Sequence, residues 1–516
     1  MADRAETVAP VRAWSLTTDG KWALVLGLIG AAWSSWRIWV PSLWADEGAT
    51  LSAVQRTWSE LWALLGRIDA VHGVYYALMK VWFTILPMNV VTLRLPSLLA
   101  VGLLIGLTYL VSRSWFSPAW AGLAAGLVAA LPRTTWMAIE GRSWAIGALV
   151  VLGATLALMR WRRTGRSGAL VAYGLLLVLG ISLNIYVVFM VAAHGLSLLM
   201  QRVAVRRLAR WAVVAVLAMV VSAPVLVAAN HEKAQLGDRE QLGLFGWARD
   251  VVVKQFALGD TPAETAVWVP QAVWSSAAVA LALLAWGAIA LSLVFAVRDA
   301  RAGDARAEMA SSPHWEALAW TIPWIVLPPT FVLLASLLTD GNLYHPRYFA
   351  FAVPAFAIAV VAGLRRIGPR TARVALIGML VVLTVPVHLS QRDVDSKGGY
   401  DWSQVADAVS SGARAGDGVY FGTEPPTRVI SLAYPSAFTG MDDFTLVLTP
   451  AQEGSLDGES TPLSPTLLRA APQRIWGVWS NRDGGRASDH AALIAAGYHD
   501  RYRWVGSATT VILMER

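Results

Sequence analysis

The apolar residues of this chain fall into long runs, unlike the shorter periodic patterns of a water-soluble domain. A run of about 20 predominantly apolar residues is long enough to cross a bilayer as an α-helix. A further apolar stretch, 71–86, is ambiguous in this respect. The stretches long enough to span, or nearly so, predict about eleven membrane helices, at 21–40, 93–112, 118–133, 143–159, 168–182, 184–200, 210–229, 271–297, 318–338, 348–365 and 372–390.

Arginines in four short loops indicate the orientation of these helices, because positive charge concentrates on the cytoplasmic side. If all four loops are cytoplasmic, each interval between them must contain an even number of spans, and each contains two. The first helix must then run outward, so 71–86 becomes a helix lying on, or dipping into, the outer face. The clusters are Arg160, Arg162, Arg163 and Arg166; Arg202, Arg206, Arg207 and Arg210; Arg298, Arg301 and Arg306; and Arg365, Arg366, Arg370 and Arg373.

The composition changes after the last apolar run. Residues 391–516 alternate short strand-like stretches with helical ones, which predicts a small α/β domain on the outer face. We expect a cytoplasmic tail (1–20), a membrane domain (21–390) with a first outer loop (41–92), and this outer domain. The fold class is therefore a polytopic α-helical protein of the plasma membrane with a small C-terminal extracytoplasmic α/β domain. Its predicted strands are 418–422, 474–479 and 503–514, its helices 402–413 and 490–496, and 450–466 is predicted to be a mobile loop.

The overall composition agrees with a membrane protein. Of the 516 residues, 56% are hydrophobic and only 15% are charged, which is too apolar for a soluble enzyme of this size. Tryptophan is abundant, as is typical of membrane interfaces, and the absence of cysteine excludes disulfides, thiolate metal sites and cysteine nucleophiles. The net charge of +8 resides in short loops, a distribution that fits membrane orientation and does not indicate nucleic-acid binding.

The unusual polar motifs all fall on the predicted outer side. Ordinary solvated loops would be scattered over both faces, so this convergence indicates a functional site. The first motif, Asp46-Glu47, follows directly on the first apolar run, where ionisable groups are costly to desolvate. A helix N-cap is the alternative explanation for this pair. The other motifs are the His72 segment, Glu140-Gly-Arg142, Asn184-Ile-Tyr186, the loop 230–270 and Tyr344-His-Pro-Arg347-Tyr348.

Asp46 and Glu47 have different predicted directions. Neighbouring residues on a helix point about 100° apart. One carboxylate can therefore face a reacting hydroxyl while the other structures the site. A carboxylate near a hydrophobic wall is a suitable general base for an alcohol.

The segment Asp69–Lys80 places His72, Tyr76 and Lys80 on one helical face, with Tyr75 beside them. This pattern predicts a wall of the same pocket that hydrogen-bonds a sugar or a phosphate. The alternative is an interfacial helix with tyrosines and a lysine whose ammonium reaches toward water.

Two further motifs carry an arginine. Arg142 and Arg347 can each bind a phosphate through two parallel hydrogen bonds, and Glu140 can hold Arg142 or bind a sugar hydroxyl. A local Glu–Arg pair and an interfacial anchor are the respective alternatives. HExxH, P-loop and GxSxG motifs are absent, so the sequence gives no support for zinc proteolysis, nucleotide hydrolysis or a serine nucleophile elbow. The charged residues His231, Glu232, Lys233, Asp238, Arg239 and Glu240 are expected to form a solvated face.

In their order and spacing, these motifs resemble the C-type (GT-C) glycosyltransferase superfamily over about residues 20–365. More narrowly, the chain is similar to the protein O-mannosyltransferases and aminoarabinose transferases, in an actinobacterial-type version. The matching elements are Trp44-Ala-Asp-Glu-Gly-Ala-Thr50, Asp69-Ala-Val-His-Gly-Val-Tyr-Tyr76, Leu93-Arg-Leu-Pro-Ser97, Glu140-Gly-Arg-Ser-Trp144 and His345-Pro-Arg-Tyr348.

The resemblance implies a polyprenyl-phosphate-linked sugar donor, a site on the outer face, and inversion at the anomeric carbon. Asp46 would be the general base with Glu47 assisting, and Glu140 would face the sugar or Arg142. Arg142 and Arg347 would hold the donor phosphate. We group Tyr348 and Lys80 with the donor-binding residues, and assign the substrate pocket to Asp69, His72, Tyr75, Tyr76, Tyr186 and His345.

The chain departs from the family pattern at several positions. Many relatives have a Tyr-x-His-Tyr element where this chain has Leu183-Asn-Ile-Tyr186, so only Tyr186 carries over. Gly141 and Trp144 replace the usual alanine and tyrosine. Metal use varies in the superfamily; with one acidic pair and a lone Glu140, we expect no obligatory cofactor and leave a divalent cation open.

The resemblance leaves the substrates to be identified. Mannose is the expected sugar and arabinofuranose competes with it. The acceptor is a cell-envelope glycan, a glycolipid or an exported protein. A flippase for lipid-linked substrates is an alternative, but it requires polar groups in mid-span or on both faces, and the spans are nearly free of acidic residues. A catalytically inactive scaffold is a third possibility.

Overall fold

The computed structural model describes residues 18–232, 242–259, 269–301, 312–339, 341–423, 426–482 and 489–516. Most of the predicted cytoplasmic tail, the charged outer-loop residues Lys233, Asp238, Arg239 and Glu240, and Arg306 of the third arginine cluster lie outside these ranges.

A helix occupies each place where the apolar runs predict one. Within the described residues, seven helical segments are long and apolar enough to cross a membrane by length and composition, while α6, α9 and the η2–α10 segment are apolar but shorter. The helices are α1 (Thr18–Ser35), α5 (Val90–Ser112), α6 (Pro118–Ala130), α8 (Trp144–Thr164), α9 (Ser167–Leu183), α10 (Met190–Met200), α11 (Val205–His231), α13 (Gln271–Arg301), α15 (Pro313–Leu338), α16 (Val353–Leu364) and α17 (Arg370–Ser390).

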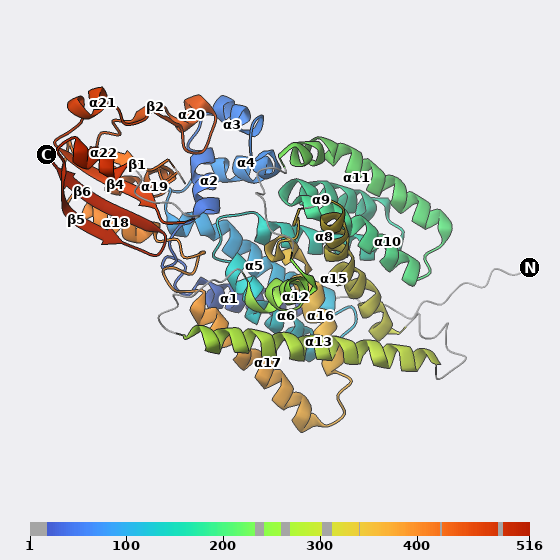
Figure 1. Cartoon of the computed structure of the whole chain (residues 1–516). Coiled ribbons are helices and arrows are strands. Elements are labelled where there is room, and N and C mark those ends of the chain that lie inside the picture. Colours follow the sequence, from blue (N-terminus) through green and yellow to red (C-terminus); the bar gives the residue numbers. More distant parts are fainter. Residues whose placement is uncertain are drawn as a thin grey trace, which may run out of the picture.

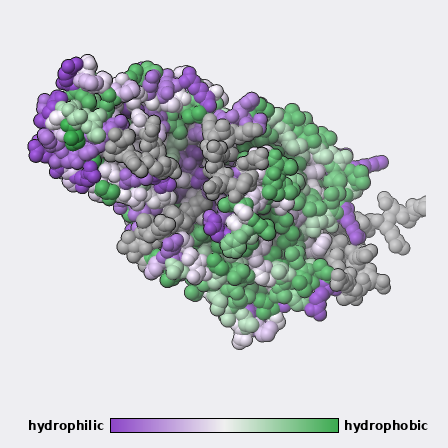
Figure 2. Space-filling model, viewed as in Figure 1, coloured by the Kyte–Doolittle hydropathy of each residue, from purple (hydrophilic) through white to green (hydrophobic). Residues whose placement is uncertain are grey.

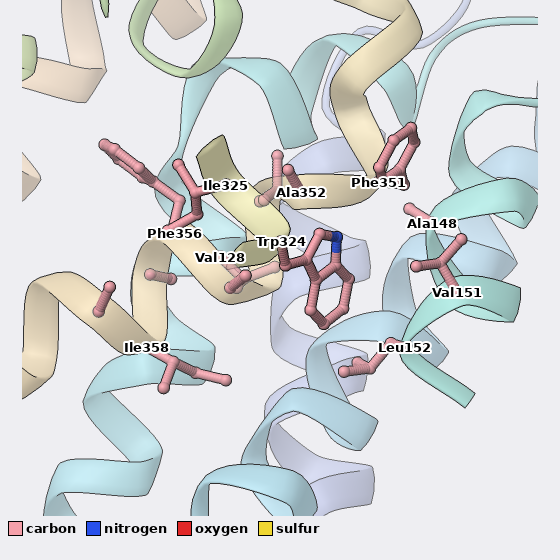
Figure 3. Packing of buried hydrophobic residues seen from close by; sticks show 14 of the residues in the cluster. Val128, Ala148, Val151, Leu152, Trp324, Ile325, Phe351, Ala352, Phe356 and Ile358 are labelled. Carbon is pink, nitrogen blue, oxygen red and sulfur yellow. The ribbon is translucent and has the colours of Figure 1, made fainter. Parts of the chain in front are cut away.

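The core of this helical bundle surrounds α16. Every residue of α16 is buried, as expected for a helix that is apolar on all sides. Figure 3 shows Trp324 of α15 near Val128 of α6 and Leu152 of α8, and these side chains belong to one continuous cluster. By contrast, α11 and α17 are largely exposed, and many of their exposed residues are apolar.

The arginine-rich loops gather at one end of the bundle. Contacts there join the ends of helices that are far apart in sequence, which is the arrangement expected if these loops share one side of the membrane. The contacts are Arg163–Glu316 (3.2 Å), Arg207 to the carbonyl of Arg162 (3.1 Å), Arg366–Asp299 (2.7 Å) and Arg113–Asp19 (3.0 Å).

The segment between α1 and α5 folds into short helices at the other end of the bundle. They are α2 (Ala45–Val54), α3 (Trp58–Leu65), the 3₁₀ turn η1 (Ala70–His72) and α4 (Gly73–Trp82). The ten residues of α4 rise about 15 Å, about half of a hydrocarbon core, so this helix is too short to span. The short segments α7 (Pro132–Met137), η2 (Ile185–Phe189), α12 (Leu244–Arg249), η4 (Asp250–Leu258) and η5 (Pro346–Ala352) complete the helical part.

The C-terminal part is an α/β domain, as predicted. Its four-stranded sheet has the order β1-β4-β6-β5, with β1 parallel to β4 and the other neighbours antiparallel. Its elements are α18 (Trp402–Ser410), β1 (Gly418–Phe421), α19 (Val429–Ala433), η6 (Pro435–Phe438), β2 (Leu446–Leu448), α20 (Pro450–Glu453), β3 (Glu459–Ser460), α21 (Pro465–Ala470), β4 (Arg474–Ser480), α22 (His490–Ala495), β5 (His499–Val505) and β6 (Thr509–Glu515).

Two predictions for this domain are wrong. The predicted strand 503–514 is a hairpin, because the Asp401 carboxylate accepts hydrogen bonds from the main-chain N–H groups of Ala508 (2.8 Å) and Thr509 (3.0 Å) and so stabilises a turn. The predicted loop 450–466 contains α20 and β3. Arginines hold it in place, since Arg56 and Arg428 donate to its carbonyl groups.

The sheet domain lies at one end of the helical bundle, next to α2 and α3 (Figure 1). Hydrophilic residues are abundant on the C-terminal domain, whereas hydrophobic residues dominate the visible face of the bundle (Figure 2). The packing against α2 is close: a Cβ atom at Gly48 would lie 2.9 Å from the ring of Trp402 and from the side chain of Val429. The helix carrying the Asp46-Glu47 pair is therefore in direct contact with both parts of the molecule.

Candidate active site

Asp46 and Glu47, in the first turn of α2, have different surroundings. The Glu47 side chain is fully buried, and its two carboxylate oxygens accept hydrogen bonds from Nε (2.8 Å) and Nη2 (2.7 Å) of Arg94. The main-chain N–H of Gly141 also donates to Glu47 (2.9 Å). The side chain of Asp46 retains 21% of its exposure and lines a cavity. The Glu47 carboxylate thus holds the structure of the site, while the Asp46 carboxylate faces the cavity. Two neighbouring residues of a helix can have these different roles because they point in different directions.

Arg94 fixes the chain that leads into α2. Its Nη1 donates to the carbonyls of Ile38 (2.7 Å) and Pro41 (2.9 Å). Three residues further along α5, the hydroxyl of Ser97 donates to the carbonyl of Glu140 (2.6 Å). The Leu93–Ser97 element therefore ties the start of α2 to the turn between α7 and α8.

Two arginines from distant parts of the chain meet at Asp46. Nη2 of Arg347 lies 3.3 Å from the Asp46 carboxylate, and Nε of Arg142 lies 4.0 Å from the same oxygen. The guanidinium of Arg347 also lies over the ring of Trp44, 5.1 Å from its centre. Arg142 lies just before α8 and Arg347 lies in the first turn of η5. The cluster therefore brings together the N-terminal ends of α2, α8 and η5.

The charges at this cluster control the protonation of Asp46. Burial raises the pKa of Asp46, but the guanidinium groups of Arg347 and Arg142 outweigh this effect and hold the pKa below its usual range. Asp46 is therefore ionised at neutral pH. Burial, reinforced by Arg142, lowers the pKa of His72 to about 4, so the His72 ring is neutral at the same pH.

A hydrogen-bonded series orients Arg142. Nη1 of Arg142 donates to the hydroxyl of Tyr76 (2.9 Å), which in turn donates to the carboxylate of Asp69 (2.7 Å). Tyr76 is fully buried, so its hydroxyl is held without competition from bulk water. Asp69 adopts a left-handed backbone conformation with a φ of +59°, which ends the preceding turn and starts η1.

The cavity beside Asp46 has a volume of about 240 Å³ and an aromatic wall. The ring of Tyr348 stacks on Tyr186 with 5.0 Å between their centres, and Trp144 lies 5.4 Å from Tyr348. The Asn184 side chain donates to the carbonyl of Tyr348 (2.7 Å) and fixes this wall. The predicted residues that line the cavity are Asp46, Asp69, His72, Arg142, Tyr186, Arg347 and Tyr348.

Glu232 also lines the cavity, and its assignment to a solvated face is wrong. Its carboxylate accepts a hydrogen bond from the main-chain N–H of Ala70 (2.9 Å), which joins the end of α11 to η1. Its position in the sequence could have indicated this role, because Glu232 directly follows an apolar run at the end where the other motifs lie. Trp144 and Asn184, which had no assigned role in the site, likewise begin or end apolar runs there.

Lys80 and Tyr75 are not among the residues that line the cavity. The Lys80 ammonium binds the carbonyls of Val54 (3.3 Å) and Arg56, at the C-terminal end of α2. The last carbonyls of a helix lack partners within the helix, and Lys80 supplies donors for them. Tyr75 is fully buried among the residues that support α4.

Glu140 contacts Lys397 instead of Arg142. Its carboxylate accepts a hydrogen bond from the indole N–H of Trp44 (2.7 Å) and pairs with the Lys397 ammonium. Burial raises the pKa of Glu140 above its usual range, although the Lys397 ammonium acts to lower it. Lys397 is 257 residues away in sequence, in the segment that leads into the C-terminal domain, so its role was not predicted.

A second cavity, of about 420 Å³, lies on the other side of Arg347. His345 belongs to its lining, which also includes Arg249, Lys254 and Lys397. Asp250 forms an ion pair with Lys254 (3.0 Å). The cavity is therefore rich in cationic groups and shares Arg347 with the first cavity.

Among the described residues there is no cluster of three or more histidine, aspartate or glutamate side chains arranged to hold a metal ion. Asp46 and Asp69, the aspartates that line the first cavity, both contact cationic or hydroxyl groups of the protein. The expectation that no metal is obligatory stays a prediction.

No protein-family model matches the chain, and no curated protein matches its sequence. Among solved structures, the chain is similar to the aminoarabinose transferase ArnT from Cupriavidus metallidurans in the apo state, with a TM-score of 0.58 and 14% identity over 96% of this chain and 98% of that one. The same enzyme bound to undecaprenyl phosphate gives a TM-score of 0.53 and 13% identity over 96% and 97% of the two chains.

The likeness to ArnT extends over almost the whole of both chains and includes the C-terminal domain. It confirms, at the level of fold, the resemblance that the motifs predict. The chain therefore shares the fold of ArnT, and the seven long apolar helices among its described residues are those of a multi-pass membrane protein.

Proposed function

We propose that this protein transfers a sugar from a polyprenyl-phosphate donor to a hydroxyl group of an acceptor outside the cytoplasm. The observation that carries the proposal is the position of Asp46, an ionised carboxylate facing an aromatic-walled cavity between two guanidinium groups. The shared fold adds support, because the ArnT structure that the chain resembles binds undecaprenyl phosphate.

The residues of the cavity can each take a different role in a displacement that inverts the anomeric carbon. The acceptor oxygen attacks the anomeric carbon while the bond from that carbon to the phosphate oxygen breaks, and polyprenyl phosphate departs with the bonding electrons. Asp46 accepts the proton of the attacking hydroxyl. Arg142 and Arg347 donate hydrogen bonds to the phosphate, whose negative charge increases as the bond breaks.

The same arginines adjust the base strength of Asp46. In the free protein they lower its pKa, which makes it a weak base. A bound phosphate offsets their positive charge, so the pKa of Asp46 rises when the donor is present. The proposed base is thus strengthened only after the donor has bound.

Other residues of the site position Asp46, Arg142 and Arg347. Glu47 and Arg94 hold the first turn of α2, and the Asp69–Tyr76 pair aligns Arg142. The stacked rings of Tyr186 and Tyr348 offer a flat apolar surface for one face of a sugar.

The orientation proposed here places the arginine-rich end in the cytoplasm and the Asp46 cavity and C-terminal domain outside. The contacts that join the arginine clusters at one end of the bundle support it, since such clusters mark the cytoplasmic side. We propose mannose as the transferred sugar, on the resemblance to mannosyltransferases, with arabinofuranose as the alternative.

A reconstituted transfer assay tests the proposal. Wild-type protein and Asp46→Asn are supplied with polyprenyl-phosphate mannose or polyprenyl-phosphate arabinofuranose and an envelope-glycan acceptor, and released polyprenyl phosphate and acceptor-linked sugar are both quantified. Transfer from one donor, reduced about 100-fold or more in Asp46→Asn, supports the function and names the sugar. Equal turnover by the two proteins contradicts the role of Asp46.

A further inference from the structure

A third cavity, of about 210 Å³, lies between α2 and the C-terminal domain. Ala45 and Ala49 of α2 form one side, and Tyr400, Trp402 and Arg482 contribute to the other. Asp46 follows Ala45 directly but lines the first cavity. The two cavities thus share the first turn of one helix, and neither the proposed displacement nor the helical core explains the third one.

A series of aromatic rings leads from the catalytic arginines to this cavity. The guanidinium of Arg347 lies over Trp44, and the Trp44 ring lies 6.1 Å from that of Tyr400 at an angle of 65°. The rings of Tyr400 and Trp402 are perpendicular, with 5.3 Å between their centres. The Arg482 guanidinium covers Tyr400 at 4.2 Å. Ring contacts therefore connect Arg347, which lines the first cavity, with Tyr400 and Trp402, which line the third.

The walls of the third cavity are fixed by buried polar contacts. Arg428 donates to the carbonyl of Asp457 (2.9 Å), a residue of the lining, and to the hydroxyl of Ser460 (2.6 Å). Asp401 holds Thr509, another lining residue, through both its main chain (3.0 Å) and its hydroxyl (2.7 Å). A cavity fixed in this way loses little freedom when a ligand binds.

The chemistry of the lining fits a neutral saccharide. A sugar ring has an apolar C–H face, which packs on aromatic rings, and a rim of hydroxyls that need donors and acceptors. The uncovered part of Trp402 and the guanidinium that Arg482 lays over Tyr400 provide flat surface, while Asp457 and Arg482 are an acceptor and a donor of opposite charge. The lining of the third cavity has no excess of positive charge, whereas the lining of the second cavity, which includes Lys254, does.

We propose that this cavity binds one sugar unit of an oligosaccharide acceptor whose terminal hydroxyl reaches Asp46. The transfer step rests on the proposed function, whereas saccharide binding at the cavity does not. The proposal gives residues 391–516 a role and favours a glycan over a protein as the acceptor. Ala45, which lines the third cavity, and Asp46, which lines the first, are neighbours in the first turn of α2.

Binding is measured first, on the full-length protein in lipid nanodiscs, with mannotetraose and arabinofuranotetraose as probes in isothermal titration. We expect wild-type protein to bind one of them, and Tyr400→Leu and Arg482→Gln to weaken that binding about tenfold. Arg503→Gln, on the exposed face of β5, is the matched control and should bind as wild type does. Absence of binding to both probes at millimolar concentration overturns the proposal.

Transfer kinetics then separate the two proposals. In Arg482→Gln the KM for the tetrasaccharide acceptor should rise about tenfold with kcat unchanged, while transfer to a monosaccharide acceptor stays the same. An equal effect on both acceptors, or no effect, contradicts the third cavity as an acceptor subsite. If no variant transfers sugar but saccharide binding still depends on Tyr400 and Arg482, the proposed function fails and the binding site stands.

Discussion

The Glu47 site and the Asp46 site lie on two sides of one helical turn and differ in how completely their charges are paired. Glu47 and Arg94 are both fully buried and joined by two hydrogen bonds, and Arg94 has further main-chain partners. Asp46 keeps part of its exposure and has its arginines at 3.3 and 4.0 Å. A fully paired carboxylate can hold a structure, whereas a partly paired one beside a cavity is available to a substrate.

Breaking the Glu47 site should produce the largest loss of stability. Glu47→Ala leaves Arg94 charged, buried and without its carboxylate, which costs about 3–5 kcal/mol. We expect a large fall in the thermal unfolding temperature in detergent. Asp46→Ala is the matched control, and an equal fall in that variant would remove the proposed distinction between the two sites.

A smaller effect is expected for Arg347→Lys at the Asp46 site. Lysine keeps the charge but loses the fork of donors that matches a phosphate, so kcat/KM for the donor should fall about tenfold or more. The unfolding temperature should change little, because lysine keeps the positive charge beside the Asp46 carboxylate. Wild-type kinetics in this variant would exclude a bidentate phosphate contact from Arg347.

Tyr76→Phe tests the positioning of Arg142. The substitution keeps the ring but removes the hydroxyl that joins Arg142 to Asp69, at a cost of about 1–3 kcal/mol. We expect the donor KM to rise about tenfold, because Arg142 is no longer aligned. Tyr75→Phe is the control on the same helix and should leave the donor KM unchanged.

A separate effect, confined to acidic pH, is a dependence of stability on pH that involves His72. Its pKa is near 6.5 in the unfolded chain and about 4 in the folded protein. The unfolded state therefore binds more protons between these values, so the stabilisation is complete above pH 6.5 and is lost as the pH falls toward 4. His72→Gln should flatten the unfolding temperature between pH 6.5 and 4; an unchanged slope would contradict the pKa assignment.

The sequence predicted the places of the apolar helices well, because runs of apolar residues follow directly from the thickness of a bilayer. It also predicted that Asp46, Arg142 and Arg347 belong to one site, because their motifs lie at ends of apolar runs that the arginine clusters assign to one side. The C-terminal sheet was predicted less accurately. The turn near Ala508 depends on Asp401, a residue more than a hundred positions away, so 503–514 was predicted as a single strand.

The sequence also could not show which groups each charged side chain contacts. Glu140 was expected to hold Arg142 or to bind a sugar hydroxyl, yet it pairs with Lys397, which is 257 residues away in the sequence. Lys80 follows the helical spacing of His72 and Tyr76, but the carbonyls at the end of α2 bind its ammonium. A helical face shows where a side chain points and leaves open which group from another element meets it.

The most direct test of the account combines two measurements on Asp46→Asn and Glu47→Gln in the same membrane preparation. Donor turnover and the thermal unfolding temperature are determined for both variants and for wild type. We expect Asp46→Asn to lose turnover about 100-fold or more while it still binds donor and unfolds near the wild-type temperature. Glu47→Gln should instead unfold at a distinctly lower temperature. Wild-type turnover in Asp46→Asn would contradict the central claim that this carboxylate is the base.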